Sequence, residues 1–138
     1  MSKRRQPRWL ERVHVEAIHD VQLSQHGGLP GLRDEGALES ALGRPRHQWH
    51  YREDANVASC AAAYGFAIAK NHAFSDGNKR TAFMAMVTFF ELNGYRLTAT
   101  EPEAVTTMLA VAAGEMSEPK LADWLRANSK RARRTTER

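Results

Sequence analysis

Nine consecutive residues, Ala82 to Phe90, form a run that is apolar on nearly every side when it is wound as a helix. Such a helix is stable only where other elements cover most of its surface, because its apolar side chains would otherwise contact water. Asn93-Gly94 is a typical helix end, and the helix is expected to begin near Asp76 or Gly77. We therefore expect this segment to be the central helix of the fold.

The rest of the chain shows helical patterning and almost no strand signals. Leu10, Val13, Ala17 and Val21 recur at spacings of three and four residues, which predicts a first helix over about 10–25. Capping and stop residues predict four further helices: from Asp34 to Gly43, from about Asp54 to Lys70, from Thr100 to about Gly114, and from Ser117 onward. Residues 44–52 are expected to form a polar connection before the third helix, and Tyr95–Leu97 to be briefly extended. These elements predict an all-α bundle of about six helices around a central apolar helix.

The chain has 138 residues and 42% hydrophobic residues, which suits one compact domain. Its single cysteine, Cys60, excludes an intramolecular disulfide and lies in an Ala-rich run, where a small buried residue is expected. No apolar stretch is long enough to cross a bilayer, and no apolar signal core follows the basic N-terminus. We expect a cytoplasmic protein with no membrane partner.

The charge is divided unevenly between the body and the two ends of the chain. Residues 1–8 hold four bases and no acid, and residues 126–138 hold six bases and one acid. Of the 20 bases and 16 acids in the chain, residues 9–125 therefore keep ten bases and fifteen acids. We expect a domain over 10–127 between solvated basic tails at 1–9 and 128–138. We expect no direct nucleic-acid binding, because no aromatic residue is interleaved in the last thirteen positions.

One segment combines an unusual set of polar side chains: His72-Ala-Phe-Ser-Asp-Gly-Asn-Lys-Arg80, where a loop turns into the apolar helix. Lys79 and Arg80 lie in or beside the first helical turn, where the partial positive charge of the helix disfavours cations. Asp76 offsets one of these charges, and a bound anion would offset the rest. Together with Gly77 and Asn78 and the free N–H groups of the turn, the two cations predict a phosphate-binding cradle.

Two further side chains predict chemistry at this cradle. A carboxylate beside bound phosphates usually holds Mg²⁺, which makes Asp76 a candidate metal ligand. An imidazole can accept a proton at neutral pH, so His72 is a candidate general base for a hydroxyl nucleophile. These are the parts that phosphoryl or nucleotidyl transfer requires. Phe74 is expected to anchor the loop on the core. Taken singly, each residue also fits a structural role, as a cap, a turn or a solvated face, and only their joint placement favours a site.

The nine residues resemble the signature of the Fic/Doc superfamily. Lys79, at a position where most Fic enzymes carry Gly, makes the segment similar to the Doc (death-on-curing) branch. Other Doc-like segments follow in the same order along about residues 10–127: Ile18-His-Asp20, Gly27–Asp34, Leu38–Ala41, Thr81-Ala82, Asn93-Gly94 and Ala112–Glu115. The resemblance implies the compact helical Fic fold.

The resemblance also implies the toxin of a toxin–antitoxin pair, which uses ATP and Mg²⁺ to phosphorylate a Thr of elongation factor Tu and so arrests translation. Its partner would be a small antitoxin whose disordered C-terminal segment folds onto the toxin. The family roles would make His72 the general base and Asp76 the acidic position linked to Mg²⁺ and to orienting the base. Gly77 would be the small residue of the turn, and Asn78, Lys79 and Arg80 would contact phosphates.

Two other functions stay open. The first is a Fic-type transferase that moves AMP to a protein hydroxyl, and the second is an inactive relative that binds an antitoxin and tunes transcription. Many AMP-transferring members carry a second Arg where this chain has Phe83, and Lys79 leaves less room than Gly for the phosphates of a nucleotide. Both differences favour transfer of the γ-phosphoryl group. The intact His72, Asp76 and Arg80 argue against the inactive alternative.

Overall fold

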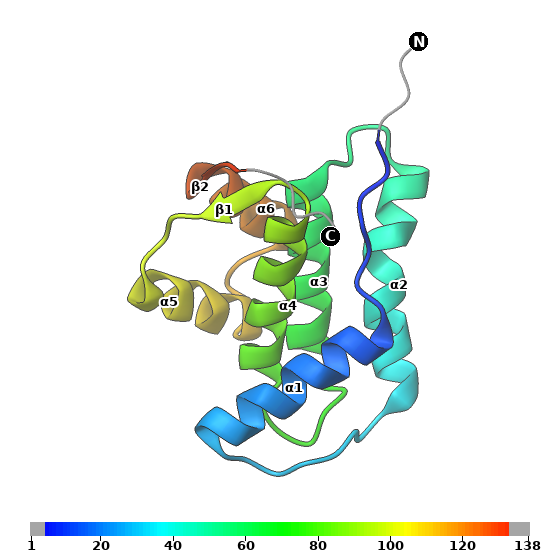
Figure 1. Cartoon of the computed structure of the whole chain (residues 1–138), viewed down its shortest axis with the longest axis vertical. Coiled ribbons are helices and arrows are strands. Elements are labelled where there is room, and N and C mark those ends of the chain that lie inside the picture. Colours follow the sequence, from blue (N-terminus) through cyan, green and yellow to red (C-terminus); the bar gives the residue numbers. More distant parts are fainter. Residues whose placement is uncertain (1–4, 133–138) are drawn as a thin grey trace.

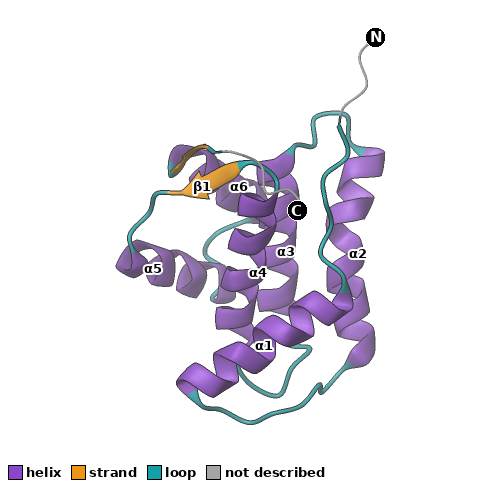
Figure 2. Cartoon of the chain, viewed as in Figure 1, coloured by secondary structure: helices purple, strands orange, loops and turns teal. Residues whose placement is uncertain are grey.

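The computed structural model describes residues 5–132, which form a bundle of six helices and one small antiparallel sheet (Figures 1 and 2). The predicted all-α bundle is confirmed. No helix among these residues is both long enough and apolar enough to span a membrane. The elements are α1 (Arg12–His26), α2 (Glu35–Tyr51), α3 (Val57–Asn71), α4 (Asn78–Leu92), β1 (Tyr95–Leu97), α5 (Glu101–Ala112), α6 (Glu118–Ala127) and β2 (Ser129–Arg131).

The helix at the centre is α3, against which α2, α4, α5 and α6 all pack. Ten of its fifteen residues are buried, compared with six of fifteen in α4. The expectation that the helix containing Ala82–Phe90 is the central one was therefore wrong. The reason is the size of the side chains: α3 is rich in alanine, and a Cβ added at Gly65 would lie 2.7 Å from the sulfur of Met86 on α4. Small residues let several helices approach one axis, so the Ala-rich helix occupies the centre.

The second helix is longer than its sequence predicts. α2 continues through Gly43 and Pro45 to Tyr51, so the expected stop and the expected polar connection over 44–52 were both wrong. A proline inside a helix removes one hydrogen bond and crowds the preceding turn. Here Pro45 and Trp49 are buried on the same side of the helix as Leu42, and this packing against the core outweighs the local cost.

The predicted caps explain where the helices begin. The Asp34 carboxylate accepts a hydrogen bond from the N–H of Ala37 at 3.0 Å, which confirms it as the N-cap of α2. Thr100 and Glu103 form the expected capping box of α5, and Ser117 caps α6. Each cap satisfies an N–H group that the helix itself leaves without an acceptor.

Both ends of the described chain are attached to the turn after α4. The backbone of Arg8 exchanges two hydrogen bonds with the Asn93 side chain, at 2.8 and 3.0 Å. The N–H of Ala132, directly after β2, donates to the carbonyl of Gly94 at 2.9 Å. The division into a domain over 10–127 and two basic tails stays a prediction, but the inner parts of both tails contact the domain. Residues 1–4 and 133–138 of those tails lie outside the described part of the chain.

Candidate functional site

The motif predicted from sequence forms the connection between α3 and α4. His72 ends α3 in the left-handed conformation, with φ 52°, and it is the one non-glycine residue with positive φ among residues 5–132. The Arg33 guanidinium donates two hydrogen bonds to the carbonyl of His72, at 2.6 and 3.2 Å. Residues held in this conformation cost about 1–3 kcal/mol and cluster at functional sites. The backbone of the candidate base is thus held in a strained conformation while its imidazole is exposed.

The loop over 27–34 lies alongside the motif. The N–H groups of Arg33 and Asp34 both donate to the carbonyl of Ala73, at 2.7 and 2.9 Å. The N–H of Ser75 donates to Gly31 at 3.1 Å, and Leu32 and Phe74 form an antiparallel bridge. This short backbone pairing explains how a loop without a regular strand holds its shape next to the start of α4.

Phe74 lies beneath the motif, with 2% of its surface exposed. Its ring stacks on the ring of His19, with centroids 3.8 Å apart and an interplanar angle of 12°. His19, on α1, is itself buried, and its Nε2 hydrogen bonds to the carbonyl of Asp76 at 2.8 Å. Sequence reasoning did not identify His19 as part of the site, although the resemblance included Ile18-His-Asp20. One imidazole thus connects α1 to both ends of the turn before α4.

The Asp76 carboxylate is held by two backbone donors. It accepts from the N–H of Leu29 at 3.2 Å and from the N–H of Gly77 at 2.9 Å. These two hydrogen bonds, followed by the positive charge of Arg80, lower the pKa of Asp76, so the group is ionised at neutral pH. The loop approaches it closely, since a Cβ added at Gly28 would lie 2.9 Å from a carboxylate oxygen. The site therefore presents a fixed negative charge at the edge of the turn.

The start of α4 has the features of an anion site. Gly77 is the N-cap, with φ 77° and no side-chain cap, and the first turn contains no acid. In the part of the chain that the structure describes, the backbone N–H groups of residues 78–80 have no acceptor, and neither Lys79 nor Arg80 forms a salt bridge. Both side chains are exposed. Three N–H donors and two cations at one helix end can bind a multiply charged phosphate.

Asn78 has a different position from the other polar residues of the motif. Its Oδ1 accepts from the N–H of Phe74, and its Nδ2 donates to the carbonyl of Phe74, both at 3.0 Å. The predicted site residues therefore fall into two groups. His72, Asp76, Lys79 and Arg80 have exposed side chains, whereas Phe74, Gly77 and Asn78 shape the turn that holds them.

A magnesium ion fits this site only together with phosphate. Among the described residues, no group of three His, Cys, Asp or Glu side chains is arranged to hold a metal by itself. Mg²⁺ commonly binds through one or two carboxylates with phosphate oxygens and water completing its shell. The ionised carboxylate of Asp76, beside the donors at the start of α4, matches that mixed donor set.

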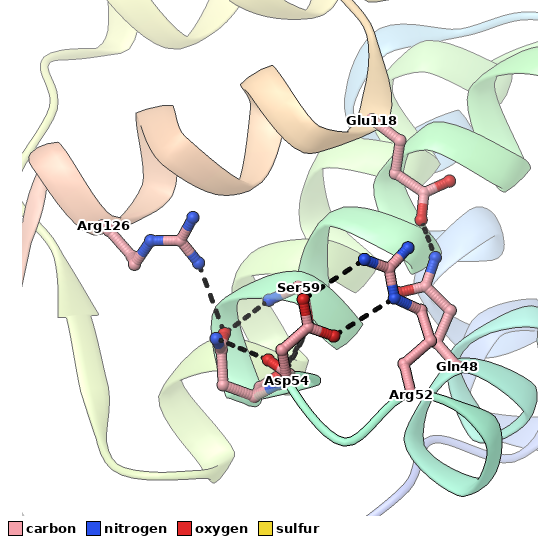
Figure 3. Close-up of polar contacts among 7 residues, drawn as sticks. Gln48, Arg52, Asp54, Ser59, Glu118 and Arg126 are labelled. Carbon is pink, nitrogen blue, oxygen red and sulfur yellow. Dashed lines mark hydrogen bonds and ion pairs between the residues drawn. The ribbon is translucent and has the colours of Figure 1, made fainter.

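A second polar cluster lies at the opposite end of α3, around a cavity of about 170 Å³ between α2, α3 and α6 (Figure 3). Glu118, at the start of α6, is buried and accepts hydrogen bonds from Arg44 at 2.7 Å and from Gln48. Arg52 pairs with Asp54 at the rim of the same cavity. The buried, paired carboxylate of Glu118 attaches α6 to α2. Sequence reasoning did not find this cluster because Glu118 lies 70 residues after its partner Gln48 in the sequence.

The comparisons with known proteins agree with the fold and the motif. The sequence matches the Fic/DOC family over residues 9–90. It is 37% identical over 110 residues to "Protein kinase doc" of Escherichia phage P1, a match that covers 80% of this chain and 86% of the relative. It is 44% identical over 75 residues to "Toxin Doc" of Mycolicibacterium smegmatis, covering 53% of this chain and 57% of that protein. Because the family match covers more than half of this chain, the chain belongs to the Fic/DOC family, and its relatives place it in the Doc branch.

Proposed function

We propose that this chain is a Doc-type toxin that transfers the γ-phosphoryl group of ATP to a protein hydroxyl. The expected target is a Thr of elongation factor Tu, whose modification would arrest translation. One observation carries the proposal: the exposed imidazole of His72 and the cationic, acid-free start of α4 belong to the same short connection between α3 and α4. A base beside a phosphate-binding helix end is the minimum that phosphoryl transfer to an alcohol requires.

The residues divide the work of the reaction. The N–H groups at the start of α4, with Lys79 and Arg80, bind the triphosphate and stabilise the charge that develops on it. His72 accepts the proton of the target hydroxyl as its oxygen attacks the γ-phosphorus; the bond from that phosphorus to the bridging oxygen breaks, and ADP leaves. Mg²⁺ held between Asp76 and the phosphates would neutralise part of their charge.

Two residues support transfer of phosphoryl rather than AMP. Phe83, at the position where many AMP-transferring members carry a second Arg, is half-buried and packs against the core, so it supplies no charge to a second phosphate site. Lys79 places a long cation where a glycine would leave space. The name of the phage P1 relative, "Protein kinase doc", supports the same choice.

The name of the Mycolicibacterium smegmatis relative, "Toxin Doc", supports a toxin, and a toxin of this kind would be neutralised by an antitoxin. We propose that the partner is a small protein whose disordered segment folds on this chain. Folding on binding lets a short segment cover a large surface of the toxin.

The decisive experiment incubates the purified chain with elongation factor Tu, ATP and Mg²⁺, and then measures the intact mass of the target. The proposal predicts the gain of one phosphoryl group, and label from γ-labelled but not α-labelled ATP. His72→Ala should abolish transfer, because it removes the imidazole that is proposed to accept the proton of the target hydroxyl. His47→Ala, which changes an exposed imidazole far from the turn, is the matched control and should react like the parent.

The alternatives have distinct outcomes. Gain of one adenylyl group would establish the AMP transferase instead. If His72→Ala stayed as toxic to cells as the parent, the inactive antitoxin-binding alternative would replace the enzyme.

A further inference from the structure

Three segments at the end of the molecule where α4 finishes are rich in cations and contain no acid. They are residues 5–8, 93–100 and 127–132, and we call them together the basic end. None of them contains Asp or Glu. Their cationic residues are Arg5, Arg8, Arg96, Lys130 and Arg131. The segments are distant in sequence, so this concentration of charge exists only in the folded chain.

Backbone contacts hold the three segments together. Arg8 is attached to Asn93, and Ala132 to Gly94, by the hydrogen bonds described above. β1 and β2 pair as an antiparallel ribbon (Figure 1). A cavity of about 300 Å³ is lined by residues of all three segments, including Arg5 and Arg131. The described parts of the two basic ends of the chain therefore line the same cavity.

The ribbon places like charges opposite each other. Arg96 on β1 is the direct partner of Lys130 on β2, and both side chains are exposed. Like charges directly opposite on neighbouring strands destabilise the pair. No acid among residues 5–132 forms a salt bridge with either of them. A polyanion bound across the ribbon would remove this repulsion.

The opposite face of the ribbon combines a cation with an aromatic ring. The Arg131 guanidinium lies over the Tyr95 ring, 5.2 Å from its centroid, and Tyr95 stacks on Phe90 at 4.9 Å. This contact holds the guanidinium in place at the surface. A positioned guanidinium matches the geometry of a phosphate group better than a freely moving ammonium does.

We propose that the basic end binds the phosphate backbone of nucleic acid, without regard to base sequence. The expectation that the chain does not bind nucleic acid treated its two basic ends as separate tails, whereas the structure brings them together. Lys and Arg side chains that neutralise backbone phosphates are the source of sequence-independent affinity.

This surface is separate from the candidate catalytic site. The motif lies at the first residue of α4 and the basic end follows its last, and a helix of 15 residues spans about 22 Å. Nucleic acid at the basic end would therefore leave the phosphate cradle open. The inference does not depend on the proposed function.

An anionic membrane is the other polyanionic surface, and the structure favours it less. Peripheral membrane binding combines cations with apolar side chains that insert between lipids. The large apolar residues that are exposed among the described residues all lie elsewhere, on α1, α2, α5 and the loop after α1: Val13, Val21, Leu29, Tyr51, Val105 and Leu109.

The test measures binding of the full chain to a short labelled DNA duplex, its single strand and an RNA duplex, by fluorescence anisotropy over a series of salt concentrations. The double variant Arg96→Gln/Lys130→Gln removes two charges whose side chains have no described partner. The control, Lys70→Gln/Lys120→Gln, makes the same change in net charge with exposed lysines outside the basic end.

We expect the parent to bind with an affinity that falls steeply with salt. On a duplex, the logarithm of the association constant should depend less steeply on the logarithm of the salt concentration in the Arg96→Gln/Lys130→Gln variant. Its slope should be smaller by about 2, or about 0.9 for each lost phosphate contact, and the control should keep the parent slope. Melting temperature should not fall in the Arg96/Lys130 variant, because the substitution removes a repulsion. Absence of binding to any nucleic acid, equal slopes for the two variants, or binding to phosphatidylserine vesicles alone would each overturn the inference.

Discussion

Replacing Asn78 by Ala removes two side-chain hydrogen bonds between the first residue of α4 and the turn before it. Two hydrogen bonds, both 3.0 Å long, connect the Asn78 amide to the N–H and the carbonyl of Phe74. Because Phe74 is buried, its backbone N–H and carbonyl cannot both form hydrogen bonds with water after the Asn78 amide is removed. The variant should therefore loosen the turn that carries the candidate catalytic residues.

The cost follows from these two contacts. Each neutral hydrogen bond contributes about 0.5–1.5 kcal/mol net, and a buried group left without a partner costs about 1–3 kcal/mol. For Asn78→Ala we expect a loss of about 2–3 kcal/mol in the free energy of unfolding. At about 2.1 cal/mol/K per residue, a chain of 138 residues has an unfolding entropy of about 0.29 kcal/mol/K. The melting temperature should then fall by about 7–10 °C.

Thermal unfolding followed by circular dichroism measures this change. Asn78→Asp is the matched variant, since its carboxylate keeps the bond from the Phe74 N–H and also lies favourably at a helix start. The loss in the free energy of unfolding should be less than half of that caused by Asn78→Ala. Asn78→Asp should nevertheless impair ATP binding, because it adds a negative charge to the phosphate cradle. An Asn78→Ala protein that melts within about 2 °C of the parent would show that these two hydrogen bonds contribute little and would refute this reasoning.

Four other substitutions test the structure. Gly77→Ala should lower the free energy of unfolding by about 1 kcal/mol, because φ at this position is 77°. Gly43→Ala, within α2 and with open space around it, should raise the free energy of unfolding by about 0.5–1 kcal/mol. Urea unfolding measures both changes. The lowered pKa of Asp76 stabilises the folded chain at pH values above the pKa of an Asp in the unfolded chain, about 3.9. This stabilisation is lost as the pH falls through the lower pKa of the folded state. The stability difference between the parent and Asp76→Asn should therefore shrink below about pH 4. Glu118→Ala should destabilise by about 2 kcal/mol, and a melting curve identical to that of the parent would contradict a role for this buried carboxylate in attaching α6.

Features that depend on neighbours within a few residues could be predicted without the structure. The α4 helix, the Asp34 and Thr100 caps and the nine-residue motif all belong to this class, because helical periodicity and capping are local interactions. The motif was recognisable for the same reason: its candidate phosphate-binding residues are contiguous, and the turn itself sets their relative positions.

Long-range packing decided the features that sequence reasoning missed or misjudged. α3 is central because its small side chains admit several neighbours, and α2 passes Pro45 because burial of that helix face outweighs a lost hydrogen bond. His19 and Arg33 reach the motif from 57 and 39 residues away, so no local pattern announces their contacts. The basic end exists because Arg8 and Ala132, near the two ends of the described chain, are hydrogen bonded to the turn after α4. Local interactions act between residues that the chain already holds together, whereas burial and pairing act between surfaces that meet only when the chain folds.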